Sequence, residues 1–115
     1  NKSELLIKYN LYAESLNKRL GYLNKVIENK NAVPIFINQV MVNGQASEFM
    51  FITNVIIRKY CNDNNIGFID IAEKVDLEIT DFYDDFHTTP EGSNKIATQI
   101  QNDLLKFFRK NLNNL

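Results

Sequence analysis

Two short apolar runs decide how this chain folds: VPIFI at residues 33–37 and GFIDI at residues 67–71. Polar or turn-forming residues bound each run, a pattern typical of strands that are buried on both faces. Pro34 cannot donate a backbone hydrogen bond, so it should lie at the first position of its strand or on an edge. Between the runs, apolar residues of the segment 48–64 recur at helical spacing. A crossover of this length predicts parallel strands joined by a right-handed connection.

Helices are predicted on both sides of this strand–helix–strand unit. From residue 3 to about residue 29, apolar side chains recur every three or four residues, which favours a long helix. A last helix is predicted to start at Pro90, with Thr88 or Thr89 as its cap and Glu91 placed for a capping box with Thr88. The predicted order is therefore helix-strand-helix-strand-helix.

The predicted sheet is too small to be covered well by its own chain. Doubly wound parallel sheets usually have about five strands, whereas this sequence of 115 residues shows two. We therefore expect one domain, at residues 1–115, that is physically incomplete. One edge of the strand at 33–37 and part of the first helix should then be covered by another chain. A homodimer or higher oligomer is the expected result.

The overall composition excludes several partners. The formal net charge is −1, and the lysines are scattered, so no basic surface for nucleic acid or an anionic membrane is expected. No apolar run is long enough to span a bilayer. Cys61 is the single cysteine, which excludes a disulfide within the chain.

The segment DDFHTTPEGSNKIA, at residues 84–97, carries the chemistry that points to a function. It contains His87, the single histidine, and histidine is the residue type that exchanges protons most readily near neutral pH. Asp84 lies three positions earlier. A carboxylate at this range can hold an imidazole in one tautomer and stabilise its protonated form. The pair could therefore act as a general base and the group that orients it.

This segment resembles the last conserved block of the SGNH (GDSL-type) hydrolases, a family of serine esterases, lipases and carbohydrate deacetylases. In that family an Asp-x-x-His, followed by a glycine and a helix, supplies two members of a catalytic triad. The resemblance makes Asp84 the triad aspartate and His87 the general base, and Gly92 falls at the glycine of the helix start. It also implies an α/β fold, the C-terminal part of a flavodoxin-like three-layer α/β/α sandwich with parallel strands.

The other conserved blocks of that family are not found in this sequence. It has no Gly-Asp-Ser with a nucleophile and no Gly-x-Asn-Asp for an oxyanion hole. The chain is therefore interpreted as the C-terminal fragment of an SGNH hydrolase domain whose serine lies in a missing N-terminal portion. The implied substrate of the parent protein is a small-molecule, carbohydrate or lipid ester, and no metal or organic cofactor is implied. The fragment alone is expected to be inactive.

The candidate site should lie at one rim of the sheet. Ligands of open parallel sheets bind beyond the carboxyl ends of the strands. The loop at 38–47 follows the first strand, and the loop that carries Asp84 and His87 follows the second, so both can reach the same rim. Asn38 and Gln39 begin the first of these loops, where they could help to position a substrate.

Other interpretations of these residues remain open. The pair could be a solvated turn within a non-catalytic, flavodoxin-like interaction module. Four side chains could instead converge on a divalent metal: Asp81, Asp84, Asp85 and His87. Cys61 lies among apolar helix positions, where a buried, inert thiol is expected rather than a nucleophile. Ser93 is too local to His87 to be a convincing nucleophile, and three aromatic residues are expected to pack or to form a lid: Phe82, Tyr83 and Phe86.

Overall fold

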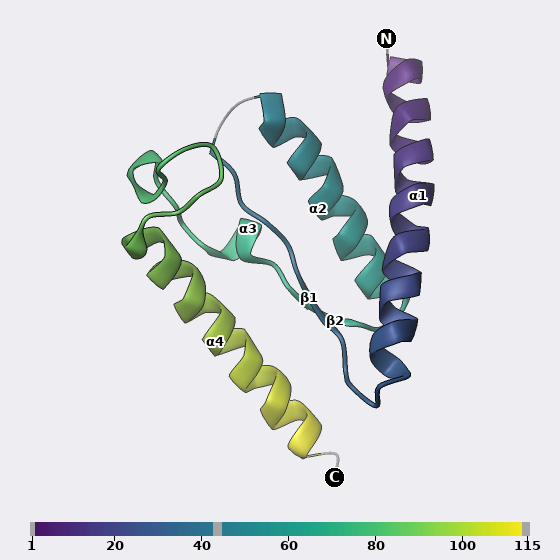
Figure 1. The fold of residues 1–115 in the computed structure, drawn as a ribbon, viewed down its shortest axis with the longest axis vertical. Coiled ribbons are helices and arrows are strands. Elements are labelled where there is room, and N and C mark those ends of the chain that lie inside the picture. Colours follow the sequence, from purple (N-terminus) through teal and green to yellow (C-terminus); the bar gives the residue numbers. More distant parts are fainter. Residues whose placement is uncertain (1, 43–44, 114–115) are drawn as a thin grey trace.

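The computed structural model describes residues 2–42 and 45–113, with side chains except those of residues 2, 3, 5 and 45–47. Within these residues the chain forms helices and two short strands, arranged as in Figure 1. In chain order the elements are α1 (Lys2–Glu28), β1 (Ile35–Ile37), α2 (Gln45–Asp63), β2 (Gly67–Ile69), α3 (Ile71–Lys74), the 3-10 helix η1 (Ile79–Asp81) and α4 (Pro90–Leu112).

The two strands form a parallel pair, with Ile35–Ile37 in register against Gly67–Ile69. Helix α2 connects them, so the predicted parallel strand–helix–strand unit is confirmed. Each strand is shorter than its apolar run. Pro34, which has no backbone N–H, immediately precedes β1. After β2, the carboxylate of Asp70 accepts a hydrogen bond from the backbone N–H of Glu73 at 3.2 Å, and this cap starts α3.

The predicted fold class is wrong. A flavodoxin-like three-layer α/β/α sandwich was expected, but the described part of the chain is mostly helical and its sheet has only two strands of three residues. The physical reason is that only two segments of this sequence have a strand-like pattern. A sheet this narrow offers little surface to either helical layer, so most of the helical surface packs on other helices or faces solvent.

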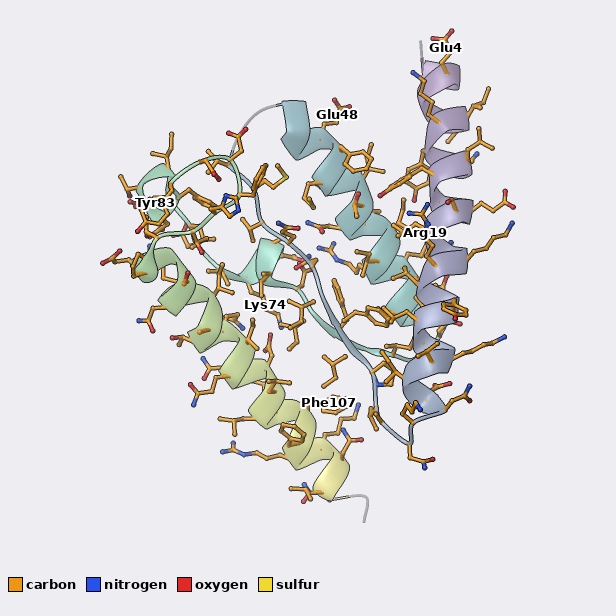
Figure 2. All side chains as sticks on the ribbon, in the orientation of Figure 1. Glu4, Arg19, Glu48, Lys74, Tyr83 and Phe107 are labelled. Carbon is orange, nitrogen blue, oxygen red and sulfur yellow. The ribbon has the colours of Figure 1, made fainter. Side chains whose placement is uncertain are left out.

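The small apolar core lies where α2 and α4 flank the strands, and both helices contact β2 (Figure 1). Phe107 of α4 lies beside this strand (Figure 2), so close that a Cβ atom at Gly67 would be 3.1 Å from its ring. Only a few apolar side chains of the described residues are buried: Leu20, Ile56, Cys61, Ile69 and Ile71.

The remaining helices are attached by specific contacts rather than by a broad core. Helix α1 packs against α2, where the ring of Tyr12 lies 5.0 Å from that of Phe49 and its hydroxyl lies 3.1 Å from that of Thr53. Helix α3 is tied to α4 because Lys74 donates a hydrogen bond to Asp103 at 2.8 Å. Within the described residues, no helix combines the length and the apolar character that crossing a membrane requires.

Candidate functional site

The candidate site lies at the tip of a closed loop between η1 and α4. The backbone N–H of Thr89 donates to the carbonyl of Asp81 at 2.8 Å, and that of Tyr83 donates to the carbonyl of His87, also at 2.8 Å. Phe82 and Thr88 form an antiparallel bridge between the two arms. These contacts hold residues 81–89 as a compact loop, and Tyr83 lies at its outer side, far from α1 (Figure 2).

The carboxylate of Asp84 organises this tip with both of its oxygens. Oδ1 accepts hydrogen bonds from the backbone N–H groups of Phe86 at 3.0 Å and His87 at 2.7 Å. Oδ2 lies 2.6 Å from Nδ1 of His87, so the contact expected from the Asp-x-x-His spacing is confirmed. The hydrogen bond from the His87 ring, followed by the two amide hydrogen bonds, lowers the pKa of Asp84 to about 2.

This geometry determines the tautomer of the neutral imidazole. An ionised carboxylate can only accept hydrogen bonds, so Nδ1 of His87 must carry the proton that it donates to Asp84. The lone pair then lies on Nε2, which has no hydrogen-bond partner among the described residues. An imidazole oriented in this way can accept a proton at Nε2 while the carboxylate stabilises the positive charge.

The pair lies at the surface rather than in a cavity. The side chain of His87 is 70% exposed and that of Asp84 is 51% exposed. The ring of Phe86 stands edge-on to the imidazole at 5.1 Å and covers part of it. A cavity of about 600 Å³ lies instead at the opposite, amino end of the strands, where Pro34, Gly67 and Phe107 are among its lining residues. A substrate at His87 would therefore need walls from elsewhere.

A buried anchor joins the loop to α4. The side chain of Asp81 is almost fully buried and accepts hydrogen bonds from Lys95 at 2.7 Å and from the backbone N–H of Glu78 at 2.9 Å. The hydrogen bond from Lys95 holds the pKa of Asp81 below its ordinary value. Gly92 lies directly against this residue, since a Cβ atom there would be 2.4 Å from the carbonyl oxygen of Asp81.

Helix α4 starts at one of the two caps that the sequence predicts. Thr89, not Thr88, is the N-cap, and its hydroxyl accepts the backbone N–H of Gly92 at 3.2 Å. The hydroxyl of Thr88 instead lies 2.7 Å from that of Ser93. The capping box predicted between Thr88 and Glu91 is therefore wrong, because the helix begins one residue later than that pairing requires.

The two loops predicted to share one rim do meet. The backbone N–H of Val42, in the loop after β1, donates to the carbonyl of Asp85 at 2.9 Å. This contact places the first loop beside the tip that carries His87.

Asn38, however, does not face this rim as a substrate-positioning residue. It is buried, donates to Asp70 at 2.6 Å and accepts the backbone N–H of Ala72 at 3.1 Å. Arg58 of α2 completes this group by pairing with Asp70 and with Glu73. These residues fasten the carboxyl ends of the two strands to each other and to α2.

Two of the alternative interpretations, a metal site and a nucleophile at Cys61 or Ser93, find little support in the geometry. The carboxylate of Asp81 faces Lys95 and the backbone of η1, and no group of three or more potential metal ligands converges among the described residues. Cys61 is 1% exposed, and burial raises the pKa of its thiol to about 11, which leaves almost no thiolate at neutral pH. Ser93 contacts Thr88 rather than His87.

Sequence reasoning missed the two groups that hold the site in place. The partners Asp81 and Lys95 are 14 residues apart, and Asn38 and Asp70 are 32 residues apart. No local spacing indicates such pairs. One signal was available, since Asn38 directly follows the run at 33–37 and Asp70 is the one charged residue near the end of the run at 67–71, where side chains of parallel strands meet.

Comparison with known proteins finds no matching family model, no similar curated protein and no similar solved structure.

Proposed function

We propose that Asp84 and His87 are the orienting carboxylate and the general base of a serine-type ester hydrolase, as in the SGNH hydrolases. The observation that carries the proposal is the 2.6 Å contact between Asp84 Oδ2 and His87 Nδ1, which leaves Nε2 free to take a proton. Gly92 supports it, because it allows the close approach of α4 to the loop at the position where the family resemblance expects a glycine.

The reaction assigns one role to each side chain. A serine hydroxyl would attack the carbonyl carbon of the ester while its proton passes to Nε2 of His87. Asp84 would stabilise the imidazolium that results, and Nε2 would return the proton to the departing alcohol. Water would then hydrolyse the acyl-enzyme with the same base. The lowered pKa of Asp84, about 2, keeps its carboxylate ionised throughout this cycle.

The proposal requires a serine and oxyanion donors from polypeptide outside this sequence. None of the described hydroxyl side chains forms a hydrogen bond with His87. The incoming segment would also have to cover the exposed imidazole, because a serine triad works in a site from which bulk water is largely excluded.

The test uses the protein encoded by the complete gene and a fluorophosphonate probe, which labels activated serines. The wild-type protein should be labelled, and His87→Ala should lower the labelling rate by roughly 10⁴-fold or more. The Asp84→Asn variant should also be labelled slowly. Asp85→Asn is the matched control, because it changes the neighbouring aspartate and should label like the wild type.

Two results would overturn the proposal. The first is a complete gene product that is labelled equally well with and without His87. The second is a gene that starts at this sequence and yields a protein that the probe does not label. The first result would mean that a serine is activated without His87, and the second would favour the non-catalytic alternative. In both cases Asp84 would serve only to close the loop through the amides of Phe86 and His87.

A further inference from the structure

The chain exposes more surface than a folded monomer of its size. A monomer of 13.4 kDa is expected to expose about 6,500 Å². This chain exposes 8578 Å². Its radius of gyration is 16.0 Å, whereas a compact chain of this length should have about 13 Å. The excess area, roughly 2,000 Å², exceeds the roughly 800 Å² that each partner buries in a standard protein interface.

The open edges of the sheet lie on the flat sides of the molecule. The chain measures 50 × 36 × 20 Å, and Figure 1 views it along the shortest axis. In this view the paired strands β1 and β2 overlap, so their hydrogen bonds run along the thin direction. No other strand of the described residues covers β1 on its outer side. Ile37 is 43% exposed, and Val33, just before the strand, is 71% exposed.

The register shows which backbone groups are unpaired on this edge. The N–H of Asn38 donates to the carbonyl of Ile69, so Asn38 and, two residues earlier, Phe36 face β2. Because successive residues of a strand face opposite neighbours, the N–H and C=O groups of Ile35 and Ile37 point outward. Ile35 and Ile37, with Phe36 between them facing β2, therefore form a short segment of β1 whose outer backbone groups are open to a partner.

The carboxyl end of this open segment is closed by α2. The side chain of Asn54 donates to the carbonyl of Gln39 at 2.8 Å and accepts its N–H at 3.4 Å, as a neighbouring strand would. Asn54 is itself buried. A partner strand could therefore pair with Ile35 and Ile37 but not with Gln39.

We infer that a second copy of this chain covers this edge, with the two β1 strands antiparallel and a two-fold axis at Phe36. In that arrangement Ile35 lies opposite the partner's Ile37, and each pair exchanges two backbone hydrogen bonds. The open segment is thus complementary to itself, which a two-fold interface requires. The isoleucine side chains meet as cross-strand pairs, which covers the exposed Ile37. The dimer then has one continuous four-stranded sheet.

The first test measures the mass of the 115-residue chain in solution by sedimentation equilibrium. Wild-type protein should be a dimer at high micromolar concentration, and Ile37→Lys should be a monomer, because a charge on an edge strand opposes pairing. Ile79→Lys is the matched control, since Ile79 is 75% exposed on η1 and lies outside the strand. It should remain a dimer, and circular dichroism should show the same helix content in all three.

The second test examines the register by mild oxidation of cysteine variants. Two copies of Phe36 lie opposite each other as a non-hydrogen-bonded pair, with Cα atoms about 4.5 Å apart, so Phe36→Cys should form an intermolecular disulfide. In the Ile37→Cys variant the Cα atoms would be about 8–9 Å apart, too far for a disulfide. The wild type should stay unlinked because Cys61 is buried.

Three outcomes would overturn the inference: a wild-type monomer at high micromolar concentration, an Ile37→Lys variant that remains a dimer, or cross-linking of Ile37→Cys in preference to Phe36→Cys. This inference does not rest on the proposed hydrolase function. A strand from flanking polypeptide would compete for the same edge, which is why both measurements use the 115-residue chain.

Discussion

Gly92 and Asp81 approach so closely that a Cβ atom at Gly92 would lie 2.4 Å from the carbonyl oxygen of Asp81. That carbonyl accepts the N–H of Thr89 and closes the loop that carries His87. The first turn of α4 and the candidate site therefore share one tightly packed contact. Any side chain at position 92 has to push the helix away from the loop.

We expect Gly92→Ala to lower the free energy of unfolding by about 1–3 kcal/mol, the usual cost of overpacking a buried contact. Chemical denaturation measures this change. Gly21→Ala is the matched control, because a Cβ there would be 3.4 Å from the Tyr60 hydroxyl, an ordinary contact, and alanine favours a helix interior. Equal stabilities of Gly92→Ala and the wild type would contradict this account.

Much of the fold could be predicted because its causes are local. The apolar spacing of the helices and the two buried runs place α1, β1, α2, β2 and α4 within a few residues of their observed bounds. The fold class was not predicted correctly. The resemblance to the SGNH hydrolases implied a wider sheet, but the sheet can contain only segments with a strand-like pattern, and the described chain supplies β1 and β2.

In the candidate site, too, the local contacts could be predicted and the long-range ones could not. The contact between Asp84 and His87 was predictable because one loop brings residues three positions apart into reach. The pairing of Asn38 with Asp70 depends on where two strands end relative to each other, which no local pattern contains. Asn38 was therefore predicted to face a substrate, although burial and two hydrogen bonds direct it into the protein.

The hydrogen bond between Asp84 and His87 predicts an unusual tautomer. In the neutral ring the proton should lie on Nδ1, and long-range ¹H–¹⁵N correlation spectra distinguish it from the Nε2–H form. Asp84→Asn should remove this preference, because an amide can accept from Nδ1 or donate to it. Asp85→Asn should leave the spectrum unchanged. An Nε2–H tautomer in the wild type would refute the assignment.

The 115-residue chain by itself should have negligible esterase activity. A serine triad without its nucleophile loses on the order of 10⁶-fold in turnover. Hydrolysis of p-nitrophenyl acetate should therefore not exceed the rate that a surface imidazole supports. Enzyme-like turnover that disappears in His87→Ala would show that a nucleophile within this chain had been overlooked.

The thiol of Cys61 should react very slowly while the chain is folded. It is 1% exposed, so a reagent can hardly reach the sulfur. Burial also raises its pKa to about 11, so very little of the thiol is in the reactive thiolate form. A chromogenic disulfide reagent at pH 8 should detect the thiol only after denaturant is added. Rapid reaction of the native protein would mean that α2 opens readily around Cys61.

Protonation of Asp84 should weaken the loop that carries His87. The hydrogen bonds from the His87 ring and from the amides of Phe86 and His87 stabilise its ionised form, which lowers its pKa from 3.8 to about 2. Because the folded-state pKa is lower than the unfolded one, the carboxylate stabilises the fold above about pH 4. This contribution is lost as the pH falls from 4 through 2.

Carboxyl ¹³C shifts of Asp84 should therefore titrate with a midpoint near 2. Over the same interval the amide signals of Phe86 and His87 should shift, because they donate to that carboxylate. Asp84→Asn should abolish this acid-dependent change in the loop. A midpoint close to 3.8 would mean that these hydrogen bonds are not stable in solution, and Nε2 would then lack the fixed orientation that a general base needs.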